Sequence, residues 1–145
     1  MAPQPVTALR HHHEYAAKVV CGVVKEEKGP LNVGRYFTAV NVHNPSTKEA
    51  RLCVKLAIAS PGHGGNITKF HSFDLKPDQA LELDCEFVRK LADGADFVKG
   101  FLVIKCVGEL DVVAVYTAGA LEGGRVAAMH TERVPMRSIV GGFEC

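Results

Sequence analysis

Tryptophan is absent from this sequence, and aromatic residues make up only 7% of its 145 residues. Sugars and other planar ligands are usually held on exposed Trp and Tyr rings, which combine an apolar surface with a polar group. Only Tyr15, Tyr36 and Tyr116 are available for such stacking. The composition therefore disfavours a carbohydrate-binding platform.

An excess of charge of one sign is also missing. The chain has 17 Lys and Arg against 16 Asp and Glu, a formal net charge of +1, and the two signs are interleaved along it. Binding to a phosphate backbone depends on a clustered basic surface. We therefore expect no nucleic-acid partner.

Long apolar runs and catalytic motifs are lacking as well. No segment approaches the roughly 20 apolar residues of a membrane span, and the N-terminal stretch has no secretory signal. The sequence contains no CxxC, GxGxxG, P-loop, GxSxG or HExxH motif. We expect a cytoplasmic protein that is not inserted in a membrane, that carries no cofactor and that is not an enzyme.

Cysteine is present in an odd number, five. Cys21, Cys53, Cys85 and Cys106 lie within apolar strand patterns, where Cys most often acts as a small buried hydrophobic residue. Cys145 is expected to be exposed. At least one thiol must be free or paired between chains, and the spacing does not determine which cysteines pair.

Alternation of apolar and polar residues dominates the chain, and helical periodicity is scarce. Strand patterns recur about seven or eight times, separated by turns rich in Gly, Pro and Asn. We predict an all-β domain, a two-sheet antiparallel β-sandwich of immunoglobulin-like or jelly-roll type, over residues 15–138. Residues 1–14 would be an N-terminal arm and residues 139–145 a C-terminal tail.

The most regular stretch runs over residues 34–60, GRYFTAVNVHNPSTKEARLCVKLAIAS. It reads as two strands joined by the turn HNPSTKE, and we predict a hairpin that serves as framework. Leu81, Leu83, Cys85 and Phe87 alternate with acidic residues, which predicts a further strand. A short helical turn is predicted over VRKLAD.

Several blocks resemble a family of small uncharacterised prokaryotic β-sandwich proteins. They are YFTAVNVHNP, LKPDQALELDC, FVKGFLVIKC, ELDVVAVYTAG and ERVPMRS, and the resemblance spans roughly residues 15–138. It implies no particular chemistry. More distantly, the order of features is similar to that of the soluble transducer of bacterial sensory rhodopsin, which implies a β-sandwich that assembles as a tetramer. The corresponding stretch here, LDVVAVYTA, has neither the His nor the Arg of that pattern, so this resemblance concerns architecture only.

Three histidines are candidate metal ligands. His11 and His13 in HHHEY share one side of an extended chain and could hold a metal together, with His130 as a further ligand. The alternative is a solvated arm or a purification-tag remnant. His130 also forms an i, i+2 pair with Glu132, which suggests either an exposed polar pair or an improvised hydrolytic site.

Four residues are candidate ligand contacts. His43 and Asn44 stand where a strand meets a turn, and His63 is flanked by glycines in the loop SPGHGGN, which lets a ligand approach the backbone. Tyr116 is the fourth. The alternatives are a structural role for His43 and a mobile loop around His63.

Two strands, GFLVIKCV and LDVVAVYTAGAL, are apolar on both faces. One face of each fills the core, and a second subunit is the simplest cover for the other. We predict a subunit interface with Val112, Ala114 and Tyr116, or with their alternates Val113, Val115 and Thr117.

These observations favour a non-catalytic binding or scaffolding protein that self-assembles into a homo-oligomer, with a trimer or tetramer preferred. Its further partner would be another protein or a small ligand. The alternative is a metal-binding or redox protein that uses its His or Cys residues.

Overall fold

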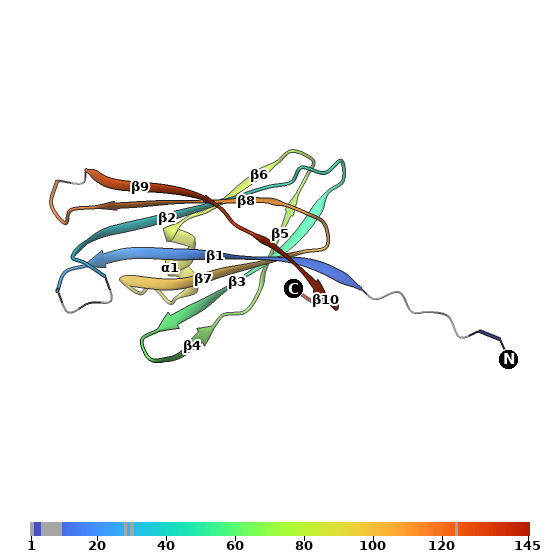
Figure 1. The fold of residues 1–145 in the computed structure, drawn as a ribbon, viewed down its shortest axis with the longest axis horizontal. Coiled ribbons are helices and arrows are strands. Elements are labelled where there is room, and N and C mark those ends of the chain that lie inside the picture. The colour runs from blue at the N-terminus through green and yellow to red at the C-terminus, as the bar shows by residue number, and fades with distance from the viewer. Residues whose placement is uncertain (1, 4–9, 28, 30, 124) are drawn as a thin grey trace.

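The computed structural model describes residues 2–3, 10–27, 29, 31–123 and 125–145, and this part of the chain is almost entirely β (Figure 1). The all-β prediction is confirmed. Ten strands are present in the described part, more than predicted, with one short helix. They are β1 (His11–Val24), β2 (Gly34–His43), β3 (Ala50–Ser60), β4 (His63–Ile67), β5 (His71–Leu75), β6 (Ala80–Leu83), α1 (Cys85–Leu91), β7 (Phe97–Cys106), β8 (Asp111–Gly119), β9 (Val126–Arg133) and β10 (Met136–Val140).

All strand pairs are antiparallel, and they join into one hydrogen-bonded network with the order β4-β3-β7-β1-β2-β8-β9. Strand β1 is central. One of its edges pairs with β7 over residues 13–22, while its other edge pairs with β10 at its start and with β2 at its end. Between residues 15 and 22 that second edge has no strand partner in the described chain.

A single hydrophobic core holds the network together. The predicted alternation is visible in β1, β2 and β7, where buried residues recur at every second position along most of the strand, whereas β3 buries Leu52, Cys53 and Val54 in succession. The core residues of β1, β3 and β7 are Tyr15, Ala17, Val19, Cys21, Leu52, Val54, Leu56, Val98, Leu102, Ile104 and Cys106, and those of β2 and β8 are Val40, Val42, Val112 and Ala114. Strands at distant positions in the order thus share one core, so the sheet is curved around it.

The predicted hairpin over residues 34–60 is wrong. Strands β2 and β3 both form, but they do not pair with each other. β2 pairs with β8, β6 and β1, whereas β3 pairs with β7, β5 and β4. The turn between them is a crossover from one part of the sheet to another. Local alternation cannot distinguish these cases, because the partner of a strand is decided by packing with distant segments.

The strand predicted through Phe87 ends earlier, at Leu83. Asp84 acts as the N-cap of α1, since its carboxylate accepts a hydrogen bond from the Phe87 backbone N–H at 3.1 Å. The helix buries Val88 in the core and is followed by Gly94 at φ 77°. The predicted helical turn is therefore confirmed. Because Asp84 caps the helix at its start, Cys85 and Phe87 belong to α1 and not to the predicted strand.

The segment RVAAMHTERVPM reads as one strand in the sequence, but the structure has two strands here, β9 and β10. β9 pairs with β8, and β10 pairs with the start of β1. Pro135 lies between them and has no backbone N–H for a ladder, which suits the point where the chain changes partner. The loop around His63 likewise contains a short strand, β4.

The predicted domain boundaries fall inside strands, because β1 begins at His11 and β10 continues to Val140. Residues 1 and 4–9 of the predicted arm lie outside the described residues. In the described part of the chain, no helix is long and apolar enough to cross a membrane.

Two disulfides are present. Cys21–Cys85 joins β1 to α1 with a Cα–Cα distance of 5.4 Å, and Cys53–Cys145 joins β3 to the last residue with a distance of 5.5 Å. Cys106 is a buried free thiol. The four internal cysteines are buried and Cys145 is exposed, as expected, but their pairing was not foreseeable from the sequence.

Candidate functional site: an exposed strand and the pocket beside it

Strand β9 is exposed along its whole length. Every residue from Val126 to Arg133 is exposed, including Val126 at 64% and Met129 at 69%. It pairs with β8 on one side and ends the strand order, so in the described chain no strand covers its other edge. Such an edge presents unpaired N–H and C=O groups to any strand that can align with it.

The face of β2, β8 and β9 that points away from the core is also apolar. The pairing register places Phe37, Thr117 and Met129 in one row and Ala39, Val115 and Thr131 in the next. Phe37 is 55% exposed. We call this surface the outer apolar face; it consists of Phe37, Ala39, Val113, Val115, Thr117 and Met129. It is the uncovered second face that the sequence predicts.

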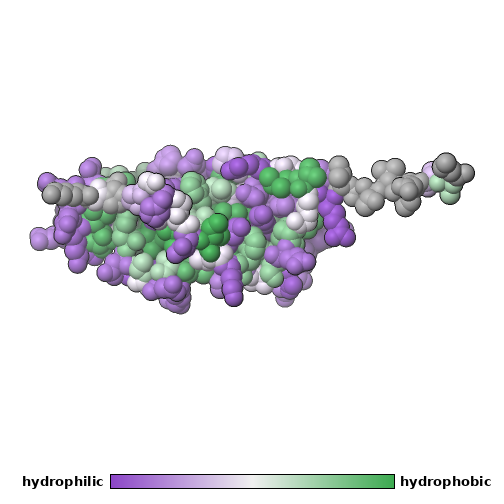
Figure 2. Space-filling model, turned by 90° about the horizontal axis from the view of Figure 1, so that it is seen from below, coloured by the Kyte–Doolittle hydropathy of each residue, from purple (hydrophilic) through white to green (hydrophobic). Residues whose placement is uncertain are grey.

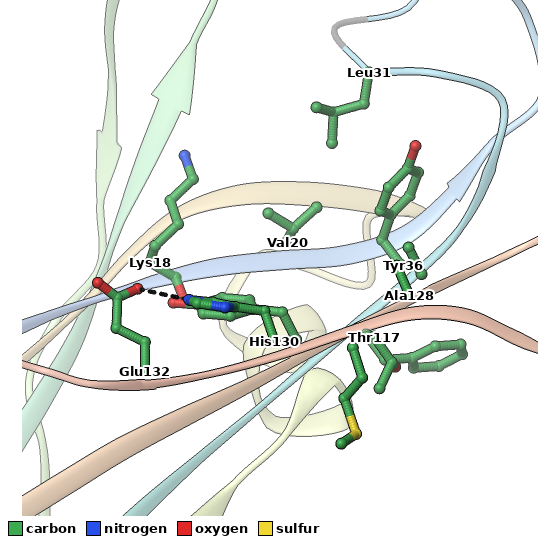
Figure 3. Close-up of a pocket in the computed structure, with 12 residues that line it drawn as sticks. Lys18, Val20, Leu31, Tyr36, Thr117, Ala128, His130 and Glu132 are labelled. Atoms are coloured by element: carbon green, nitrogen blue, oxygen red, sulfur yellow. Dashed lines mark hydrogen bonds and ion pairs between the residues drawn. The ribbon is translucent and has the colours of Figure 1, made fainter.

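A pocket of about 410 Å³ lies between β1 and β9 (Figure 3). Its size falls within the range of small-molecule sites. The residues that line it come from β1, β2, β8, β9 and the loop before β2; they are Lys18, Val20, Leu31, Tyr36, Phe37, Tyr116, Thr117, Ala118, Ala128, Met129, His130 and Glu132.

The pocket exists because β1 and β2 separate soon after they pair. Between residues 16 and 21, where this edge of β1 has no strand partner in the described chain, side chains form hydrogen bonds with the β1 backbone instead. The Thr38 hydroxyl accepts a hydrogen bond from Val20 N–H at 2.9 Å and donates one to Val20 O at 3.0 Å. The Tyr116 hydroxyl donates to Lys18 O at 2.7 Å. These bonds satisfy part of the open edge and leave the space beside it unfilled.

One end of the pocket carries its polar groups. The Tyr116 and His130 rings are stacked, with centroids 6.2 Å apart and planes 18° apart. His130 Nε2 lies 4.0 Å from Glu132 Oε2. Burial raises the pKa of Tyr116, and the charge of Glu132 raises it further.

Lys18, on the neighbouring strand, is half-buried, and burial lowers its pKa, as does the charge of Lys99. Its Nζ lies 5.2 Å from the centre of the Phe101 ring. Among the described residues, Lys18 forms no ion pair with a carboxylate, as the eight pairs of the structure involve other groups.

Of the four predicted ligand contacts, the structure places only Tyr116 in this pocket. His43 closes β2, with Nδ1 2.8 Å from Asp111 Oδ2 and Nε2 3.4 Å from Asp78 Oδ1. The hydrogen bond to Asp111 raises the pKa of His43. His63 is exposed on β4, which does not neighbour β2 or β8.

The burial of Asn44 contradicts its predicted role as a ligand contact. Its side chain is fully buried, and the amide donates to the carbonyl oxygens of Lys48 at 2.8 Å and Leu75 at 3.0 Å. Its Oδ1 accepts from Ser46 N–H at 3.0 Å. Asn44 therefore ties turns together and is not available to a ligand.

The predicted metal ligands are not brought together. His11 and His13 lie at the start of β1, opposite Val140 and Ser138 of β10, while His130 lies on β9. In the described part of the chain, no group of three or more His, Cys, Asp or Glu is arranged to hold a metal. The pocket does hold His130 and Glu132 together, but without a Ser or Cys among its lining residues.

The predicted interface residues divide between two faces. Val112 and Ala114 are 1% and 0% exposed in the core of their own chain, so they have no surface to offer a partner. The alternates Val113, Val115 and Thr117 are half-buried on the outer apolar face. Of the two predicted sets of interface residues, the one with Val113, Val115 and Thr117 is therefore the one that a partner could contact.

Lys18 was not foreseeable as a site residue. In the sequence it is one polar residue in an alternating strand, and it lines a pocket only because β1 and β2 diverge beside it. The exposure of β9 was also missed, since its Val-Ala-Ala-Met run reads as a core strand.

No protein-family model matches the chain, and no curated protein matches it. Among solved structures, the chain is similar to a Thermotoga maritima protein described as "Crystal Structure of Thermotoga maritima 1070", with a TM-score of 0.47 and 9% sequence identity over 96% of this chain and 97% of that chain. A similarity at this level carries no argument about fold or function. The comparisons name no family, and the resemblance to the rhodopsin transducer finds no support in them.

Proposed function

We propose that this protein is a non-catalytic binding or scaffolding protein that self-associates through β9 and the outer apolar face. One observation carries the proposal: an eight-residue strand is exposed at every position and has an open edge. A lone chain would leave this strand as a template for uncontrolled pairing, whereas a second copy covers it with an identical edge.

The residues of β9 support a two-fold antiparallel pairing of two copies. In such a pairing one residue faces itself, and residues at equal distances on either side face each other. Centred on Thr131, the arrangement sets His130 opposite the partner's Glu132, twice by symmetry. No two like charges then face each other. Cross-strand pairs of this kind contribute roughly 0.2–1 kcal/mol each.

Pairing through β9 would extend the outer apolar face across two chains, and that larger face would still need a cover. A second pair of chains packed face to face would supply it. The proposal therefore favours a tetramer, a dimer of dimers, over a trimer. We also propose that each subunit is a two-layer β-sandwich, because core residues of β3 and β8 belong to one cluster although the strands lie far apart in the sheet order.

A redox or metal-binding role is the second candidate, and one observation favours it. Cys145 is exposed, so the Cys53–Cys145 bond is open to exchange with an external dithiol. Elemental analysis of protein purified without nickel tests the metal form of this candidate. A cytoplasmic location stays a prediction, against which the two disulfides weigh, since such bonds persist mainly in oxidising compartments.

The experiment is light scattering coupled to size exclusion at micromolar concentration, on the natural chain and two variants. Met129→Lys places a charge on the outer apolar face. Ile67→Lys is the matched control, because Ile67 is 66% exposed on β4, at the opposite end of the strand order. β4 lies at the lower side of Figure 1, and Figure 2, which views the molecule from below, shows hydrophobic and hydrophilic residues mixed on that surface.

We expect a tetramer for the natural chain and for Ile67→Lys, and smaller species for Met129→Lys. A natural chain that elutes as a monomer overturns the proposal. Equal assembly of all three proteins would place the interface elsewhere and would refute the role of the outer apolar face.

A further inference from the structure

The pocket between β1 and β9 is polar at one end and apolar at the other. Figure 3 shows Glu132 beside His130, and Lys18 next to them with its ammonium nitrogen directed away from Glu132, while Leu31 and Tyr36 lie toward the other side. A pocket with this asymmetry suits a ligand that has a charged head and an apolar body.

The two charged groups of the pocket have opposite signs but are not paired with each other. Lys18 Nζ lies over the Phe101 ring, and Glu132 Oε2 is directed to His130. Glu132 Oε1 has no ion-pair partner among the described residues. Lys18 is half-buried and has no carboxylate partner among the described residues, so a ligand carboxylate would supply the counter-ion that its ammonium lacks there.

The two tyrosine hydroxyl groups of the pocket are already engaged, which leaves the hydroxyl of Thr117. Tyr116 donates to Lys18 O, and Tyr36 donates to Asn32 O. Few neutral hydrogen-bonding groups therefore remain for a sugar or another polyhydroxylated ligand. The remaining wall, which includes Val20, Leu31 and Ala128, offers apolar contact only.

We propose that this pocket binds a small zwitterion with an apolar side chain, of the class of a free hydrophobic amino acid. The ligand carboxylate would meet Lys18 and its ammonium would meet Glu132, while its side chain would lie against Val20, Leu31 and Tyr36. The volume of about 410 Å³ suits one such molecule better than a long chain. This inference deepens the binding role proposed above by naming its ligand class.

Other ligand classes fit the charges less well. A simple carboxylic acid would satisfy Lys18 but would bring a second negative charge near Glu132. A simple amine would satisfy Glu132 and leave Lys18 without a counter-ion. A molecule that carries one charge of each sign matches the pair better than either.

Isothermal titration calorimetry at neutral pH tests the proposal with three probes that share a phenyl ring: L-phenylalanine, 3-phenylpropionate and 2-phenylethylamine. We expect L-phenylalanine to bind most tightly. Each analogue that lacks one charge should bind roughly tenfold more weakly, as expected for the loss of one hydrogen bond to a charged group. Tighter binding of 3-phenylpropionate or 2-phenylethylamine, or no measurable heat with L-phenylalanine, overturns the proposal.

Two variants and a control assign the charges. Lys18→Met should weaken L-phenylalanine binding roughly tenfold without weakening that of 2-phenylethylamine. Glu132→Gln should likewise weaken L-phenylalanine binding roughly tenfold without weakening that of 3-phenylpropionate. Lys55→Met is the control, because Lys55 is half-buried on β3 and lies over the Phe70 ring, as Lys18 lies over Phe101, without lining the pocket. Equal effects of all three substitutions would refute the assignment.

Thermal melts of each variant show whether it is folded, and a variant that fails to fold is replaced by Lys18→Gln or Glu132→Ala. Light scattering of the same samples reports assembly separately, which is needed for the Glu132 variants because Glu132 also faces the partner's His130 in the proposed β9 pairing, whereas the Lys18 variants leave that pairing untouched. A tetramer that binds no probe would overturn the ligand assignment and leave self-association standing, whereas a monomer that binds L-phenylalanine would do the opposite.

Discussion

Replacing Asn44 by alanine should destabilise the protein more than any exposed polar substitution. The Asn44 side chain is 0% exposed and connects its own turn, at Ser46 and Lys48, to Leu75 and Lys76, which are distant in the sequence. Its amide nitrogen lies 2.8 Å from Lys48 O, 3.0 Å from Leu75 O and 3.3 Å from Lys76 O, and its oxygen accepts from Ser46 N–H at 3.0 Å.

The size of the loss follows from what the alanine leaves behind. A hydrogen bond contributes about 1 kcal/mol net, and each buried group left without a partner costs about 1–3 kcal/mol. The bond to Leu75 O is buried, while those to Lys48 O and Ser46 N–H are partly buried. We therefore expect a fall in the free energy of unfolding of about 3 kcal/mol. For a chain of this size, that corresponds to a decrease in Tm of roughly 6–12 °C.

Urea unfolding followed by circular dichroism measures this difference, and Asn66→Ala is the matched control. Asn66 is exposed on β4, so its loss should change the free energy of unfolding by less than about 0.5 kcal/mol. If Asn44→Ala proves as stable as Asn66→Ala, the hydrogen bonds of Asn44 do not support the turns, and the earlier interpretation of Asn44 as a ligand contact regains its basis.

Two further predictions concern charge and covalent links. The pKa of His43 is raised by its hydrogen bond to Asp111, so the stabilisation from this pair is complete below the ordinary His pKa of about 6.5 and is lost as pH rises through the raised value. His43→Gln should therefore lower the Tm at pH 5.5–6 and leave it unchanged at pH 9, and a pH-independent difference would contradict the assignment. The Cys21→Ala/Cys85→Ala double variant should lose about 4 kcal/mol in urea unfolding without reductant, because the bond closes a loop with a sequence separation of 64; a variant as stable as the natural chain would mean that the bond contributes nothing.

Much of the secondary structure could be predicted from the sequence, and the pairing of the strands could not. The alternation in β2 and β3 identified both strands, since burial of one face imposes a period of two. It did not identify their partners. Either strand could join any other with a matching apolar face, and the structure pairs them with β8 and β7, which come much later in the chain.

The candidate site shows the same division. Tyr116 and His130 were both selected from the sequence, one as a ligand contact and one as a metal ligand, but only the register of β8 and β9 reveals that they stack. Lys18 and Glu132 belong to β1 and β9, which are not paired with each other. Their shared pocket depends on the curvature of the whole sheet, a property that no local pattern encodes.

Strand β1 is synthesised before every strand with which it pairs, so its pairing is completed late. Its start pairs with β10, near the opposite end of the chain, and its other edge waits for β7. During synthesis the edges of β1 must therefore remain open until β7 and β10 have emerged. Nascent and C-terminally truncated chains should consequently depend on chaperones to a degree that the finished protein does not.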